Sequence, residues 1–299
     1  MAGTDQLTPE RVLRRLEWRV IRRLDGRLQG DYRTFFRGTG LDFTDLREYA
    51  PGDDLRHIDW NVTARMDQPF VREYVEDREV TGWLLLDRSA SMAFGPADRQ
   101  KDLVMAEVAT TLAQVLARSG NQVGAILFDH DVEKTLRPGH GRKQVLRIAS
   151  ELLKPPMHPD GTAPTDLAVL LRAASGVIRR RSLVVVVSDF ISEPGWEQPL
   201  GILARRHDVV AISVLDRREG ELPRAGMIWI EDAETGEQIF VDSDDESFRS
   251  RLSSAAEQRQ AELRETVRSA GTELHTVTTD EDLVRALVRI SELRKRLRR

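Results

Sequence analysis

From Gly82 onward, continuous apolar runs alternate with stretches of helical periodicity, and no other feature of the sequence constrains the fold as much. Apolar runs without polar interruption are typical of strands that helices cover on both faces, as in parallel sheets. Strands are expected at residues 83–86, 123–128, 183–187, 209–214 and 273–277, with an edge hairpin at 227–230 and 238–241. Helices are expected at about 99–118, 141–153, 166–179, 196–206 and 244–269, and a last helix is expected to open at Asp280. The pattern predicts an α/β fold with a mostly parallel sheet flanked by helices.

The first 79 residues lack this alternation, so we expect residues 1–79 and 80–299 to be separate parts of the chain. Thr8 and Pro9 are typical of a helix start, and apolar residues recur at helical spacing as far as about residue 26. Between residues 40 and 79 the sequence indicates short extended pieces and turns, including a strand at 70–75. The basic tail, residues 294–299, is interpreted as a solvated helix end.

Composition excludes several classes of function. The chain has 45 basic and 49 acidic residues and a formal net charge of -4, so no strong positive field favours nucleic acid or an anionic membrane. It contains no cysteine, which excludes disulfides, thiolate nucleophiles and Cys-ligated zinc and is typical of a reducing compartment. We expect a cytoplasmic protein, because the sequence has neither a signal pattern nor an apolar run of about 18 residues.

Three expected loops carry oxygen ligands to one edge of the sheet. Asp87, Ser89 and Ser91 follow the first buried strand, and Ser188 and Asp189 follow another. A third loop, residues 162–165, leads into a helix and contains two threonines. Open α/β sheets bind ligands at the carboxyl ends of their strands. These side chains are therefore the candidate site.

Hydroxyl and carboxylate oxygens favour a hard cation, and Mg²⁺ takes about six oxygens, several of them from water. Asp87 and Asp189 are the only charged ligands in this set, and the hydroxyls are neutral, so we expect the ion to attract a further carboxylate. A carboxylate from another protein can then complete its coordination. We therefore expect one Mg²⁺ or Mn²⁺ ion and a partner that supplies an acidic side chain.

The same residues resemble the metal ion-dependent adhesion site of von Willebrand factor A domains, which carries an Asp-x-Ser-x-Ser motif, a threonine and a later aspartate. Asp87, Ser89, Ser91 and Asp189 match by type, order and strand context. Thr165 is preferred as the threonine, although Thr162 follows a glycine as in many such domains. The resemblance implies a von Willebrand factor A-like, Rossmann-like fold over residues 80–299.

A longer resemblance covers roughly residues 30–200. The stretch from Gly40 to Arg65, with Gly52-Asp53-Asp54-Leu55-Arg56 and Ile58-Asp59-Trp60 at its centre, is similar to the signature of the DUF58 family, which precedes an A domain. This implies a bacterial accessory or chaperone-like protein that works with a MoxR-type AAA+ ATPase in protein assembly or remodelling. Many relatives have membrane helices before the signature. This chain has none, so membrane attachment is not carried over.

Other interpretations remain open at this point. Asp87, Ser89 and Ser91 are also ordinary capping residues. The cluster of Arg47, Asp53, Arg56, Asp59 and Trp60 is interpreted as a structural ion-pair network, with a binding face as the alternative. A metal-assisted phosphoryl-transfer hydrolase is the competing function. However, no nucleotide loop, Gly-x-Ser-x-Gly elbow or His-Glu-x-x-His motif occurs, and no general base is evident beside the metal ligands. We therefore expect no catalytic residues and no nucleic-acid partner.

Overall fold

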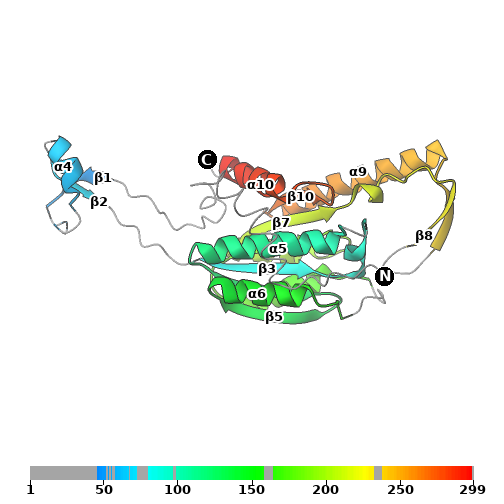
Figure 1. Cartoon of the computed structure of the whole chain (residues 1–299), viewed down its shortest axis with the longest axis horizontal. Helices are drawn as coiled ribbons and strands as arrows, with labels where there is room; N and C mark the ends of the chain where they lie inside the picture. Colours follow the sequence, from blue (N-terminus) through cyan, green and yellow to red (C-terminus); the bar gives the residue numbers. More distant parts are fainter. Residues whose placement is uncertain are drawn as a thin grey trace, which may run out of the picture. The chain divides into compact units, whose positions relative to one another are not determined.

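The computed structural model describes residues 46–51, 53, 55, 58–66, 68–72, 80–96, 99–157, 164–231 and 238–297 (Figure 1). They belong to two compact units, one within residues 37–79 and one that contains residues 80–297, and each unit is treated by itself below. The helix expected over residues 8–26 lies outside the described residues.

A six-stranded sheet forms the centre of the larger unit. Its strands are β3 (Thr81–Asp87), β4 (Gln122–Phe128), β5 (Val132–Gly139), β6 (Leu183–Ser188), β7 (Asp208–Leu215) and β10 (Glu273–Thr278). Their order across the sheet is β10-β7-β6-β3-β4-β5. All neighbouring pairs are parallel except β4 and β5. The expected α/β fold with a mostly parallel sheet flanked by helices is confirmed.

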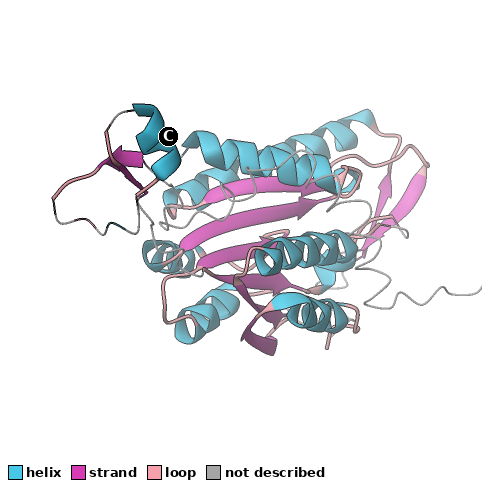
Figure 2. Ribbon diagram, turned by 60° about the vertical axis from the view of Figure 1, so that its left-hand side comes forward, coloured by secondary structure: helices cyan, strands magenta, loops and turns pink. Residues whose placement is uncertain are grey.

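Helices cover both faces of this sheet (Figure 2). One face packs against α5 (Lys101–Arg118), α6 (Gly141–Leu152) and α10 (Leu283–Leu297), and the other against α7 (Leu167–Val177), α8 (Glu197–Arg206) and α9 (Glu246–Ser269). Successive strand residues alternate between the two cores, so Leu84 and Leu86 join the first and Trp83 and Leu85 the second. Each fully buried large apolar side chain contributes about 1.5–3 kcal/mol.

The strand order reverses between β3 and β6. These neighbours are in parallel register, with Leu86 opposite Val187, and the strands that follow each of them lie on opposite sides. Such a reversal leaves a crevice beyond the carboxyl ends of the two strands, where open α/β sheets bind ligands. The expected site residues Asp87 and Asp189 stand at these two strand ends.

Two elements, a strand and the start of the last helix, differ from the sequence prediction. β5 was not expected, because most of its side chains are polar or exposed and only Leu136 is buried, as suits an edge strand. The last helix begins at Leu283 rather than at Asp280. Asp282 accepts a hydrogen bond from the Arg285 N–H at 3.1 Å, whereas the Asp280 carboxylate accepts one from the Thr278 hydroxyl.

The expected hairpin is present as β8 (Met227–Glu231) and β9 (Gln238–Asp242), which pair in antiparallel register. It connects η4 (Arg217–Glu219), a short 3₁₀ helix after β7, with α9. Trp229 and Phe240 lie opposite each other with ring centroids 4.9 Å apart, and both are more than half exposed. The hairpin therefore contributes little to either core.

The interpretation of the basic tail as solvated is wrong for its first residue. Arg294 is buried, and its guanidinium donates to both carboxylate oxygens of Asp208, at 2.9 and 3.0 Å. The side chains of residues 295–299 lie outside the described part of the chain. Among the described helices, none combines the length and the apolar character that a membrane crossing requires.

The smaller unit pairs β1 (Leu46–Glu48) with β2 (Phe70–Arg72) in antiparallel register and adds the short helix α4 (Trp60–Met66). The Arg47 guanidinium donates twice to the Asp53 carboxylate, both times at 2.7 Å, and holds the pKa of Asp53 well below its usual range. Asp59 accepts from the Val62 N–H at the start of α4. The expected structural role of these charges is thus observed for this pair and this cap, while Arg56 lies outside the described residues.

Candidate metal site

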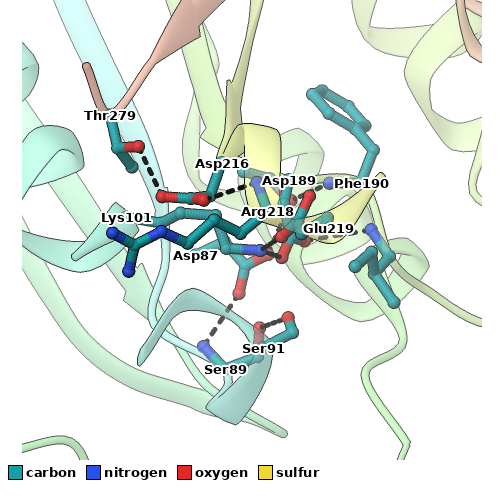
Figure 3. A network of polar contacts seen from close by, with 12 residues as sticks. Asp87, Ser89, Ser91, Lys101, Asp189, Phe190, Asp216, Arg218, Glu219 and Thr279 are labelled. Carbon is teal, nitrogen blue, oxygen red and sulfur yellow. Dashed lines mark hydrogen bonds and ion pairs between the residues drawn. The ribbon is translucent and has the colours of Figure 1, made fainter. Parts of the chain in front are cut away.

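Asp87, the last residue of β3, is buried at the centre of the candidate site (Figure 3). Its Oδ1 accepts a hydrogen bond from the Ser89 N–H at 3.0 Å, and its Oδ2 accepts one from the Ser188 hydroxyl at 2.6 Å. Ser188 ends the neighbouring strand β6. Parallel pairing of β3 and β6 therefore fixes the orientation of the Asp87 carboxylate.

The two serines of the motif lie side by side. Ser89 precedes the 3₁₀ helix η3 (Ala90–Ala93) and Ser91 lies within it, with exposed fractions of only 2% and 5%. Their Oγ atoms are 3.1 Å apart. Adjacent ligands of an octahedral ion with bonds of ~2.1 Å are ~3.0 Å apart. The spacing therefore suits two hydroxyls that bind one ion.

Neither serine of the motif caps a helix through its side chain in this structure. Ser89 stands at the start of η3, but its side chain makes no capping hydrogen bond. The N-cap residue of α5 is Gln100, not a residue of the motif. The hydroxyls of Ser89 and Ser91 contact each other instead.

Asp189 follows Ser188 and is also buried. Its Oδ1 accepts from the Ile191 N–H at 3.0 Å, and its Oδ2 accepts from the Lys101 ammonium at 2.7 Å. Phe190, which lies between Asp189 and Ile191 in the sequence, has a positive φ of 60°. Its N–H donates to the Ser188 hydroxyl. A non-glycine residue in this conformation is uncommon and is often found at functional sites.

Thr165 stands on the loop before α7 and is fully buried. Its carbonyl accepts a hydrogen bond from the Glu193 N–H at 2.8 Å, and the Ser192 hydroxyl accepts one from the Leu167 N–H. These bonds connect the Thr165 loop to the loop that carries Asp189. The structure thus brings Asp87, Ser89, Ser91 and Asp189 together and places Thr165 on an adjoining loop, while Thr162 lies outside the described residues.

Two buried carboxylates dominate the electrostatics around Asp87. Burial and the nearby Asp189 carboxylate raise the pKa of Asp87 to about 7, although hydrogen bonds from Ser188 and Ser89 oppose the shift. A divalent ion held by these residues would offset this repulsion. Across the described part of the chain, no group of three or more His, Asp or Glu side chains is arranged to hold a metal. A metal at this site therefore depends on hydroxyl ligands as well as on two carboxylates.

Sequence reasoning missed three residues of the site. Ser188 was noted only for its position beside Asp189, yet it holds Asp87. Lys101 is fully buried and contacts Asp189 and Glu219, which are 88 and 118 residues away in the sequence. Burial opposes the charge on Lys101, but the two carboxylates raise its pKa above the ordinary value. Nothing in the sequence around Lys101 or Glu219 indicated this contact.

A cavity of about 550 Å³ adjoins the site. Asp189 and Ile191 line it together with η4 and one side of α9, including Glu219 and Arg264. The cavity provides room beside the candidate ligands for a segment of another molecule.

Comparison with known proteins gives a clear family match. A family described as "Protein of unknown function DUF58" matches residues 45–262. The uncharacterized protein Rv1480 of Mycobacterium tuberculosis is 36% identical over 285 residues, which cover 95% of this chain and 89% of that protein. The uncharacterized protein YeaD of Bacillus subtilis is 33% identical over 93 residues, covering 31% of this chain and 21% of YeaD.

Solved structures are more distant. BatB from Bacteroides thetaiotaomicron superimposes with a TM-score of 0.46 at 15% identity, covering 74% of this chain and all of that one. The manganese-loaded TRAP protein of Plasmodium vivax gives a TM-score of 0.35 at 20% identity, covering 45% of this chain and 57% of that one.

Proposed function

Because the chain belongs to the DUF58 family, whose function is unknown, we propose its function from the site: it is a non-catalytic module that binds one Mg²⁺ or Mn²⁺ ion and thereby holds a partner protein. The proposed ligands are Asp87, Ser89, Ser91, Thr165 and Asp189. The observation that carries the proposal is the pair of buried carboxylates at the point where the strand order reverses, beside two hydroxyls 3.1 Å apart.

When bound, the ion supplies positive charge and a coordination position for an oxygen from outside the protein. The chain's own residues orient the ligands: Ser188 holds Asp87, and the Ile191 N–H holds Asp189. Serine and threonine hydroxyls are neutral, and the Lys101 ammonium offsets part of the charge of Asp189, so the protein's own ligands do not fully balance the ion. The natural occupant of its remaining position is an Asp or Glu side chain of the partner.

The partner we propose is a MoxR-type AAA+ ATPase, which the family resemblance suggests, with the chain as its accessory protein in assembly or remodelling of other proteins. Neither the family description nor the names of the relatives above state a catalytic activity. Phosphatase, protease or NTPase turnover by the purified protein that disappears in Asp87→Asn would contradict this function and favour metal-assisted phosphoryl transfer.

Titration calorimetry with Mn²⁺ tests the site directly. We expect Asp87→Ala to lose metal binding, because it removes a ligand. Ser188→Ala should bind roughly 10–100-fold more weakly, as is typical when a partner that orients a ligand is lost. The matched control is Asp131→Ala, which removes an exposed carboxylate after β4, on the same edge of the sheet. Unchanged Mn²⁺ affinity in a folded Asp87→Ala protein would sink the assignment.

A further inference from the structure

Lys101 is the first residue of α5, and its side chain is fully buried. Its ammonium donates to Asp189 Oδ2 at 2.7 Å and contacts the Glu219 carboxylate (Figure 3). It also lies 5.8 Å from the centre of the Phe94 ring. Lysine is almost never fully buried unless it is paired. This cation is therefore built into the site and placed on one of the proposed metal ligands.

The Asp189 carboxylate already accepts one hydrogen bond on each oxygen, from the Ile191 N–H and from Lys101. Because Mg²⁺–oxygen bonds are about 2.1 Å long, an ion on the oxygen that Lys101 contacts would lie within about 5 Å of the ammonium. Like charges at that distance in a buried site repel strongly. The divalent ion and Lys101 therefore compete for the same carboxylate.

Resting on the metal site proposed above, we propose that Lys101 is a positioning residue that holds Asp189 in the metal-free protein and weakens metal binding by the protein alone. Lys101 neutralises one negative charge of the site, and a carboxylate of the bound partner makes up for that lost charge. Metal and partner consequently bind cooperatively, and by linkage each strengthens the other to the same degree. When the partner dissociates, the protein binds the ion more weakly, so the interaction is reversible.

A purely structural ion pair predicts the opposite sign. If Lys101 served only to stabilise the fold around Asp189, its loss would disturb that ligand and lower metal affinity. Under our proposal its loss removes a competing charge and raises metal affinity. The sign of the change therefore separates the two roles.

The experiment is Mn²⁺ titration of the full chain by calorimetry, with metal alone as the probe. We expect Lys101→Met to raise Mn²⁺ affinity at least tenfold and Lys101→Arg, which keeps the charge, to stay close to the unsubstituted protein. The matched control is Lys134→Met, which removes a half-exposed cation of β5 whose ion pair is with Glu151; its Mn²⁺ affinity should not change.

Thermal melting gives a second readout. Without metal, Lys101→Met should melt below the unsubstituted protein, because the buried Asp189 and the partly buried Glu219 lose the cation that compensates them. Saturating Mn²⁺ should raise its melting temperature more than that of the unsubstituted protein. Equal metal-induced shifts in the two proteins would argue against competition.

A folded Lys101→Met protein with unchanged or lower Mn²⁺ affinity overturns the inference. If that variant does not fold, the Glu219→Gln variant provides the test. It leaves Asp189 as the main partner of Lys101, so Mn²⁺ affinity should fall severalfold. An unchanged or higher affinity overturns the inference. Failure of the proposed function looks different, because then neither the unsubstituted protein nor any variant binds Mn²⁺, and both ideas fall together.

Discussion

At the scale of single residues, Asp87 shows how the fold alters ordinary side-chain chemistry. Its carboxyl group has a pKa of about 7 instead of 3.8, first because of burial and second because of Asp189. The folded state therefore holds this proton more tightly than the unfolded state does. The resulting stabilisation is present at low pH and is lost as the pH rises from the unfolded toward the folded pKa, from about 4 to about 7.

We predict that Asp87→Asn, which cannot ionise, flattens this part of the pH profile. Without metal at about pH 8, the variant should be more stable than the unsubstituted protein, by up to a few kcal/mol. Urea denaturation in the presence of a chelator, repeated from about pH 4 to about pH 8, measures the difference. Other titrating groups are common to both proteins, so parallel pH profiles would contradict the assigned shift.

At the scale of elements, β3 and the β8–β9 hairpin differ in how much of their apolar surface is buried. β3 lies in the middle of the sheet and sends side chains into both cores, and Leu85 is completely buried. The hairpin is a separate two-stranded sheet whose Trp229 is 66% exposed. Apolar content is similar in the two, but only β3 removes its apolar surface from water.

Substitution to alanine should separate these roles. We predict that Leu85→Ala lowers the free energy of unfolding by about 2–5 kcal/mol, the usual result of opening a cavity in a packed core. Trp229→Ala should cost no more than about 1.5 kcal/mol, mainly from its ring contact with Phe240. Chemical denaturation of both variants checks the contrast, and a large loss for Trp229→Ala would show that the hairpin packs against another part of the protein.

At the scale of the whole molecule, the two compact units offer two candidate surfaces for a partner. We propose that residues 80–299 form the von Willebrand factor A-like domain, which carries every proposed metal ligand, and that residues 1–79 are a separate part. The signature segment, residues 42–65, is the alternative surface. Its Arg47 is paired with Asp53, whereas Trp60 is 70% exposed.

Binding of a MoxR-type ATPase from the same organism distinguishes the two surfaces. Because the ATPase itself needs Mg²⁺, the metal concentration should be held constant and the site varied. We predict that Asp87→Ala abolishes binding, while Asp131→Ala and the charge reversal Arg47→Glu retain it. On the partner, replacing the contacting acid with lysine should abolish binding, and glutamine should only weaken it.

The opposite pattern of binding would assign the interface to another surface. If Asp87→Ala binds the ATPase as well as the unsubstituted protein does, the metal rim is not the interface. Charge reversal at Arg47 and Arg56 would then be expected to weaken binding, which would assign the interface to residues 42–65.

The sequence by itself determined the parallel strands and most helices, because an apolar run that must be buried on both faces has few alternatives in a soluble fold. It also predicted the ends of β3 and β6 to within one residue, and thus that Asp87 and Asp189 share one edge of the sheet. It did not reveal β5, whose polar side chains carry no such signal and whose strand conformation comes from pairing with β4.

Only the tertiary structure decided the electrostatics of the site. Lys101, Asp189 and Glu219 are far apart in the chain and meet because α5, β6 and η4 converge at one end of the sheet. Arg294 is paired with Asp208 for the same reason, although its neighbours in sequence indicated a solvated tail. Local sequence determines conformation and burial, but the charge that a buried group faces depends on which distant segments the packing brings beside it.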